Sequence, residues 1–171
     1  MNLRISLAIA AAIGGGLLTA PAAEARPDMV AYRGDYTPGT IVVKTNERRL
    51  YLILDERTAV RYPVGVGKAG KQWAGATKID GKYREPAWSP PADVKRDNPN
   101  MPDVIPGGSP ANPMGVAAMT LAGGEYAIHG TNRPASIGGF VSYGCVRMYN
   151  EDISDLYQRV PVGTQVVVTA H

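Results

Sequence analysis

Eight prolines fall within residues 86–113, and they restrict the fold of this 171-residue chain more than any other feature. Proline has no backbone N–H to donate and clashes with a preceding helical turn, so this density excludes long helices and central strands. Residues 70–113 are therefore predicted to form a long loop with short strands inside it. The aromatic side chains of Trp73, Tyr83 and Trp88 argue against a disordered linker. Ordered loops of this length usually cover or line a functional site.

The sequence on both sides of this loop has the pattern of β-strands. Runs rich in β-branched and aromatic residues, separated by polar turns, occur at 41–43, 50–54, 59–66, 117–121, 126–128 and 165–169. One clear helix is expected to begin at Asn150, a favoured N-cap residue, and to end before Pro161. We expect a mostly β fold, a β-sandwich or partly closed barrel with one or two short helices and loops that carry the site.

The first 25 residues have the pattern of a secretory signal peptide. Arg4 gives a positive start, residues 5–18 are apolar or small, and residues 23–25 (Ala-Glu-Ala) match a cleavage site. A membrane anchor is the alternative, but a spanning helix needs about 20 apolar residues. We expect export to the periplasm or cell wall, with no membrane span after cleavage.

Residues 26–39 mix charge, proline and glycine, and are predicted to be a leading arm or linker before one folded domain at residues 40–169. The net charge of +3 is spread thinly, without a basic stripe interleaved with aromatic residues. Nucleic acid is therefore a poor partner. A mildly basic exported protein is compatible with an anionic wall polymer.

The chain has a single cysteine, Cys145, so it cannot form an internal disulfide. A lone thiol in an oxidising compartment is a liability unless it is used, although on count alone it fits a buried, inert residue equally well. The local sequence favours a reactive role. His129 follows a predicted strand, and the glycine-containing stretch between it and Cys145 can fold back to bring imidazole and thiol together.

A thiol and an imidazole make a workable nucleophile and base. A protonated imidazole stabilises a nearby thiolate and lowers the thiol pKa, which is ordinarily near 8.5. The same imidazole then returns its proton to a leaving amine. No acid is placed to orient the ring, so a backbone carbonyl near Gly130 is expected in that role. The competing interpretation is a turn histidine without a catalytic part.

Gly144, directly before the cysteine, allows a sharp turn and close approach of a substrate. The backbone N–H groups of Tyr143, Gly144 and Cys145 are predicted to form an oxyanion hole.

Three further side chains are predicted to contact substrate. The guanidinium of Arg147 suits a carboxylate, although a surface arginine in a salt bridge is an equal alternative. The hydroxyl groups of Ser142 and Thr131 are the other two predicted contacts. No metal ligands are predicted.

Three short motifs follow one another in this region. They are IHGTN at 128–132, SIG at 136–138 and VSYGCVRM at 141–148. Together they resemble the signature of the L,D-transpeptidase catalytic domain family. Residues 40–54, 63–68 and 160–168 are similar to its opening hairpin, next strand and closing strand. The resemblance thus covers residues 40–169 and marks them as a catalytic domain.

The resemblance implies an activity in the organisation of the cell wall and of cell shape. The family's cysteine attacks a peptidoglycan stem peptide after the L-centre of its third residue, releases the terminal D-alanine and forms a thioester. An amine then takes the acyl group, which gives a cross-link between third residues or attaches a wall protein. No metal or organic cofactor takes part, and carbapenems are expected inhibitors.

Carried over position by position, the resemblance makes Cys145 the nucleophile, His129 the base, Gly130 the orienting carbonyl and Arg147 a substrate contact. The family usually has histidine where this chain has Tyr143. A phenol, with a pKa near 10, is a poor base at neutral pH, which leaves His129 as the base.

Two other functions remain open from the sequence. A hydrolase, or L,D-carboxypeptidase, would transfer the same acyl group to water. A wall-binding module would keep the fold and have lost activity through Tyr143.

Overall fold

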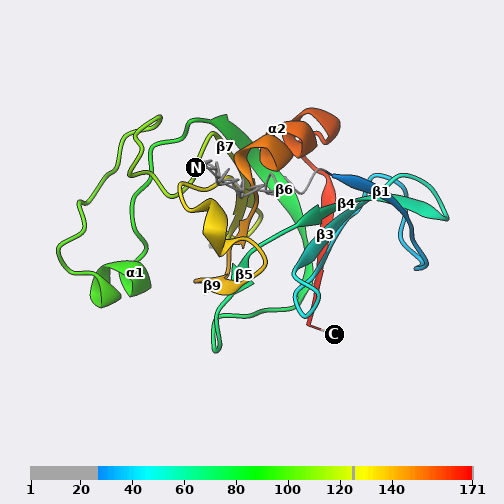
Figure 1. The fold of residues 1–171 in the computed structure, drawn as a ribbon, viewed down its shortest axis with the longest axis horizontal. Coiled ribbons are helices and arrows are strands. Elements are labelled where there is room, and N and C mark those ends of the chain that lie inside the picture. The colour runs from blue at the N-terminus through cyan, green and yellow to red at the C-terminus, as the bar shows by residue number, and fades with distance from the viewer. Residues whose placement is uncertain (1–26, 125, 171) are drawn as a thin grey trace, which may run out of the picture.

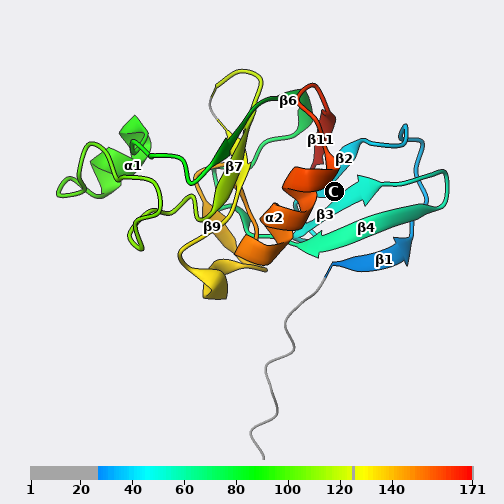
Figure 2. The same ribbon diagram turned by 90° about the horizontal axis from the view of Figure 1, so that it is seen from above.

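The computed structural model describes residues 27–124 and 126–170 (Figures 1 and 2). The predicted signal peptide lies outside these residues. Within them, no helix is both long enough and apolar enough to cross a membrane.

The described residues form eleven strands, two α-helices and one 3-10 helix. The strands are β1 (Asp28–Ala31), β2 (Ile41–Lys44), β3 (Arg49–Ile53), β4 (Thr58–Pro63), β5 (Val66–Gly67), β6 (Gly75–Arg84), β7 (Ala117–Leu121), β8 (Ala127–His129), β9 (Phe140–Ser142), β10 (Val146–Arg147) and β11 (Gln165–Thr169). The helices are α1 (Ala92–Asp97), η1 (Pro134–Ser136) and α2 (Asn150–Arg159).

Nine of these strands form one sheet in the order β1-β4-β3-β2-β11-β6-β7-β8-β10, and β5 pairs with β9. The pairs β2–β11 and β8–β10 are parallel, and the other pairs of the large sheet are antiparallel. The prediction of a mostly β fold is confirmed. The sheet has β1 and β10 as its two edges, so it is open and is not closed into a barrel.

Strand β6 corrects the prediction of a long loop from residue 70. Its first half pairs with β11 and its second half with β7, and a bulge between Ile79 and Gly81 separates the two halves. The eight prolines all follow residue 85, so nothing prevents a central strand before them. The strand was missed because few of its side chains are apolar, and Ile79 is its only buried large hydrophobic residue.

The main core lies between the sheet and α2, which packs on β7 (Figure 2). Alternate residues of the strands face it, as Ile41 and Val43 do in β2. Helix α2 adds Ile153 and Leu156, which are fully buried. The short strands β8 and β10 contribute Ile128 and Val146, so the same core fixes the strands that carry the catalytic motif.

The segment predicted as a leading arm contains strand β1, which pairs with β4 at the sheet edge. Tyr32 and Tyr36 follow it and pack with Tyr51 and Val42 on the opposite face of the sheet from the main core. Residues 28–36 therefore cover one face of the sheet.

The proline-rich loop, defined here as residues 85–116, carries α1 and extends away from the sheet (Figures 1 and 2). Buried Asn112 holds its base together, because its Nδ2 donates to the carbonyl oxygens of Pro86 at 2.8 Å and Pro106 at 3.0 Å. A two-residue bridge between Trp88 and Ile105 joins the two arms of the loop.

Candidate active site

Parallel pairing of β8 with β10 brings the distant motifs together. Arg147 is level with His129 in the register, and Cys145 lies two residues before Arg147. Residues in register on paired strands point to the same face, so His129 and Arg147 share one face, and Cys145 directly precedes β10. The positive charge of Arg147 acts on both other groups and lowers the pKa of each.

His129 is buried, and its Nδ1 lies 2.7 Å from the carbonyl oxygen of Gly130. A carbonyl oxygen only accepts, so Nδ1 carries the proton and Nε2 keeps its lone pair. Burial, and then the charge of Arg147, lower the pKa of His129 to about 4. At neutral pH this ring is therefore a neutral imidazole, and the backbone carbonyls of Gly130 and Pro113 raise its pKa to a smaller extent than burial lowers it.

Burial also shifts the pKa of the Cys145 thiol. It raises the pKa of Cys145, while a backbone hydrogen bond from Ala127 and the charge of Arg147 lower it to a smaller extent. The predicted lowering of the thiol pKa requires a protonated imidazole, and desolvation disfavours that form as well as the thiolate. The resting pair is a neutral thiol and a neutral imidazole.

The nucleophile turn, defined here as residues 142–148, is closed by Ser142. Its buried hydroxyl donates to the Cys145 carbonyl oxygen at 2.6 Å and accepts from the Gly144 N–H at 3.1 Å. These bonds occupy the hydroxyl inside the turn, which favours a structural role over the predicted substrate contact. They also engage the Gly144 N–H, one of the predicted oxyanion donors.

Gly144 is required by both its conformation and its surroundings. Its φ is +121°, and a Cβ there would lie 2.2 Å from the ring of Tyr126. Trp73 stacks on Tyr126 with ring centroids 5.0 Å apart, and its Nε1 donates to the Gly144 carbonyl oxygen at 2.9 Å. Sequence reasoning missed both aromatic residues. The available signal was the indole N–H, which needs a partner when it is buried.

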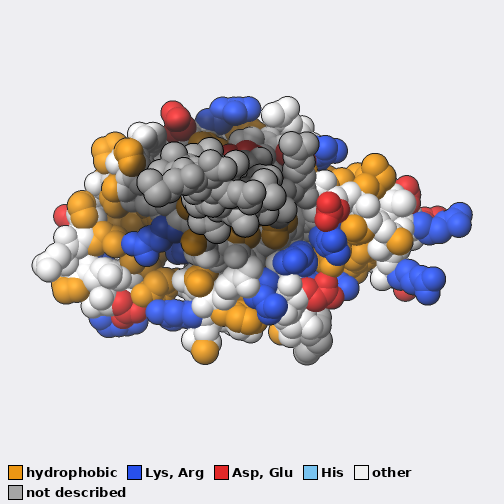
Figure 3. All heavy atoms as spheres, in the orientation of Figure 1, with side chains coloured by type: hydrophobic (Ala, Val, Ile, Leu, Met, Phe, Trp, Pro, Cys, Tyr) orange, Lys and Arg blue, Asp and Glu red, His pale blue; other side chains and the backbone are white. Residues whose placement is uncertain are grey.

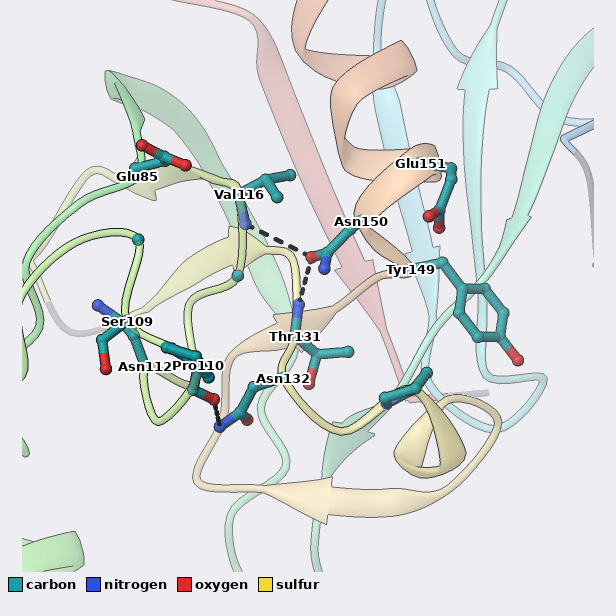
Figure 4. A pocket seen from close by; sticks show the side chains of 13 residues that line it. Glu85, Ser109, Pro110, Asn112, Val116, Thr131, Asn132, Tyr149, Asn150 and Glu151 are labelled. Carbon is teal, nitrogen blue, oxygen red and sulfur yellow. Dashed lines mark hydrogen bonds between the residues drawn. The ribbon is translucent and has the colours of Figure 1, made fainter.

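Asn150 holds the loop after His129. Its Oδ1 accepts from the N–H groups of Thr131 at 3.0 Å and Val116 at 3.4 Å (Figure 4). A Cβ on Gly130 would lie 2.3 Å from this oxygen. The predicted N-cap role of Asn150 is wrong, because the N-cap residue is Tyr149 and the Asn150 amide instead bonds to these two loops.

Thr131 and Asn150 line a pocket of about 400 Å³ at the start of α2 (Figure 4). The Thr131 hydroxyl accepts from the Arg133 N–H at 3.0 Å, which stabilises the turn. The predicted substrate contacts Thr131 and Arg147 therefore line different pockets.

A second pocket, of about 530 Å³, lies between the proline-rich loop and the nucleophile turn. Its cationic lining residues are Lys68, Arg133 and Arg147, and among residues 27–124 and 126–170 no acidic one lines it. Arg147 Nε is buried without a hydrogen-bond partner among the described residues. A buried, unpaired guanidinium N–H is costly, and the burial of Arg147 disfavours the surface-arginine alternative.

The fold brings a cysteine, a histidine and an arginine from two separate motifs to one end of the sheet. Residues 38–168 match the family model described as the L,D-transpeptidase catalytic domain, and the chain belongs to this family.

Known proteins resemble the chain in sequence and in fold. The probable L,D-transpeptidase YbiS of Escherichia coli (strain K12) is 40% identical over 162 residues, which are 90% of this chain and 49% of that protein. The chain spans about half the length of this and other curated relatives. The NMR structure of the catalytic domain from the E. faecium L,D-transpeptidase has the same fold, with a TM-score of 0.61, 19% identity, and coverage of 80% of this chain and 100% of that one.

A crystal structure from Brucella melitensis, described as a probable carnitine operon oxidoreductase, is 41% identical with a TM-score of 0.57. It covers 87% of this chain and 96% of that one. Its name denotes a different reaction and applies to that protein alone.

Proposed function

We propose that this protein is a peptidoglycan L,D-transpeptidase that acts in the periplasm or cell wall after export. The observation that carries the proposal is the placement of His129, whose Nδ1 is held by Gly130 and which lies level with Arg147, on the strand that pairs with β10 directly after Cys145. In this proposal His129 is the base for the Cys145 thiol, and the charge of Arg147 acts on both groups. The substrate is a stem peptide, and the acceptor is a second stem peptide or a wall protein.

Acylation begins when Cys145 Sγ attacks the carbonyl carbon after the L-centre of the third stem residue. The thiol proton moves to His129 Nε2 during the attack, because the resting thiol is neutral. The N–H groups of Tyr143 and Cys145 are the proposed donors to the oxyanion, since Ser142 holds that of Gly144. The carbon–nitrogen bond then breaks, His129 gives its proton to the departing D-alanine, and a thioester remains.

Deacylation reverses the roles. The acceptor amine attacks the thioester carbonyl and gives a proton to His129 Nε2. The carbon–sulfur bond breaks, and the proton returns to Cys145 Sγ. The products are an amide cross-link and the free enzyme.

Arg147 has two proposed tasks. Its charge favours the thiolate that forms as the thiol loses its proton, which follows from its lowering of the Cys145 pKa. Arg147 also lines the pocket beside the nucleophile turn, and we propose that its guanidinium binds a substrate carboxylate there. Lys and Arg side chains gather around α1 and β9 on the face that Figure 3 shows, which suits an anionic substrate.

The products formed from purified stem tetrapeptide test this proposal. We expect a cross-linked dimer and free D-alanine by mass spectrometry, and neither with Cys145→Ala. Trimmed monomer without dimer would select the hydrolase, and unchanged substrate would select the wall-binding module.

A further inference from the structure

The phenol of Tyr143, which replaces the family's usual histidine, reaches the proline-rich loop. Its hydroxyl donates to Asp97 Oδ2 at 2.5 Å, and Asp97 is the last residue of α1. Lys68 Nζ lies 3.4 Å from the same carboxylate oxygen and 3.8 Å from the centroid of the Tyr143 ring. One carboxylate of the loop thus has two partners from the body of the domain.

A second carboxylate on α1 repeats this arrangement. Asp93 precedes Asp97 by four residues, so the two side chains lie on the same helix face. Asp93 forms an ion pair with Lys71, which is three residues beyond Lys68. This face of α1 therefore docks on the segment that follows β5.

That segment is rigidly tied to the nucleophile turn. The Lys68 N–H donates to the Ser142 carbonyl oxygen at 2.9 Å, and the Lys71 N–H donates to the Lys68 carbonyl oxygen at 2.9 Å. A Cβ on Gly67 would lie 2.3 Å from the Lys71 carbonyl oxygen, so the turn is tightly packed. The partners of α1 are consequently fixed relative to Cys145.

An adjacent face of α1, roughly 100° around the helix from the two aspartates, borders the pocket. Val94 and Asn98 line it together with Met101 from the loop, across from Tyr143 and Arg147. This wall exists only while α1 stays attached, and the Tyr143 and Lys68 contacts with Asp97 are part of that attachment.

We propose that Tyr143 is a positioning residue that fastens α1 as a wall of the pocket that Tyr143 and Arg147 line on either side of Cys145 in the sequence, and that this wall favours an amine acceptor over water. The inference rests on the proposed transpeptidase function. An amine acceptor needs a formed surface that orients it, whereas water needs only access to the thioester. Attack by an amine gives an amide and free thiol, and attack by water gives a carboxylic acid and free thiol. Loosening α1 should therefore lower the yield of the amide and raise the yield of the carboxylic acid.

The main test is Asp97→Ala, with Asp103→Ala as its matched control. Asp103 is also a carboxylate of the loop, but its partner is Lys95 at 2.6 Å within the loop itself. The ratio of trimmed monomer to cross-linked dimer is measured by mass on stem tetrapeptide. We expect it to rise about three- to tenfold in Asp97→Ala, the range for loss of one hydrogen bond, and to stay unchanged in Asp103→Ala. The rate of carbapenem adduct formation on Cys145 should be unchanged in both.

Tyr143→Phe, the double variant and Asp97→Asn sharpen the test. Tyr143→Phe should raise the ratio by no more than Asp97→Ala does, and adding it to Asp97→Ala should change little, since the hydrogen bond that it removes is already lost there. Asp97→Asn keeps an oxygen that accepts from the phenol and should restore part of the wild-type ratio. Amide hydrogen exchange over residues 92–97 should quicken in Asp97→Ala and Tyr143→Phe but not in Asp103→Ala.

Two results would overturn the inference. One is an unchanged product ratio in both Asp97→Ala and Tyr143→Phe, and the other is an equal rise in Asp103→Ala. Failure of the proposed function looks different, because the wild-type protein would then give no dimer at all.

Discussion

The nucleophile turn and the proline-rich loop border the same pocket, yet different forces hold them. The turn is held by strand pairing of β10, by the buried Ser142 hydroxyl and by the indole of Trp73. Helix α1 of the loop is held mainly by half-exposed side chains, in particular Asp93, Asp97 and their partners.

This difference assigns the two regions different tasks. Buried hydrogen bonds keep their geometry when salt or pH changes, so the groups that react stay preorganised. Exposed ion pairs weaken with salt and contribute little each. The structure therefore combines a fixed reaction centre with an adjustable wall.

Within the fixed reaction centre, His129→Ala should have the largest effect on the acylation rate. Removing the base should lower the acylation rate at neutral pH by about 10²- to 10⁴-fold, the usual contribution of general base catalysis. The rate should partly recover as the pH rises towards 9, because the fraction of thiolate grows with pH, although burial raises the pKa of Cys145 and limits that recovery. Carbapenem adduct formation followed by mass from pH 6 to 9 measures this. A variant with the wild-type profile would remove His129 from the mechanism.

Gly144→Ala should break the turn itself. The new Cβ would meet Tyr126, and we expect acylation to fall by about a hundredfold, as when an oxyanion donor is lost. Gly123→Ala is the matched control, because its φ of +108° imposes similar backbone strain with nothing within 4 Å of the Cβ. Similar acylation rates in the two variants would show that the packing against Tyr126 is dispensable.

Trp73→Phe should have a smaller effect on the same turn. Phenylalanine keeps a ring against Tyr126 but loses the N–H that bonds the Gly144 carbonyl oxygen. We expect about a tenfold slower acylation, as for loss of one hydrogen bond. Stopped-flow acylation at fixed inhibitor concentration measures it, and a wild-type rate would contradict the role of this bond.

Two buried groups, His129 and Asp152, should change the free energy of unfolding in opposite directions as the pH rises. Burial lowers the pKa of His129 to about 4, below its value in the unfolded chain, so its contribution makes stability rise as pH rises from about 4 to 6.5. Burial, Glu151 and Asp155 raise the pKa of Asp152 to about 7, so its contribution makes stability fall as pH rises from about 4 to 7.

A variant that lacks one of these two groups should keep only the other group's contribution to the slope of unfolding free energy against pH. Asp152→Asn should become more stable relative to wild type as pH rises from 4 to 7, and His129→Gln should become less stable. Urea unfolding at several pH values measures both slopes. Parallel curves for wild type and both variants would contradict the burial-based shifts.

The smallest effect should be that of salt on helix α1, the adjustable wall. Raising the sodium chloride concentration to about 0.5 M should screen the ion pairs of α1. Hydrogen exchange over residues 92–97 should then quicken by no more than a few fold, while β8 and β10 are unchanged. Equal changes in both regions would remove the distinction between them.

The sequence predicted the parts of this site that depend on local pattern. Six strands and α2 lie where apolar periodicity placed them, because their side chains form the main core. The contact between His129 Nδ1 and the Gly130 carbonyl oxygen is also where the sequence predicted an orienting group, since it joins adjacent residues.

Contacts between distant residues could not be predicted in the same way. Trp73 bonds Gly144 across 71 positions, and Tyr143 bonds Asp97 across 46. No local periodicity encodes such pairs. Strand β6 was missed for a related reason, because its place between β11 and β7 comes from backbone pairing and its own side chains are largely polar.

The acyl-enzyme formed from the natural class of donor tests the central claim most directly. Wild-type protein mixed with stem tetrapeptide is quenched in acid, and intact mass and peptide mapping locate any adduct. The account predicts a mass gain equal to the donor less its D-alanine, placed on Cys145 and released by hydroxylamine as a thioester is. Cys145→Ala should show no adduct while remaining folded. The same adduct on the Cys145→Ala protein, or dimer formation by that protein, would contradict the account.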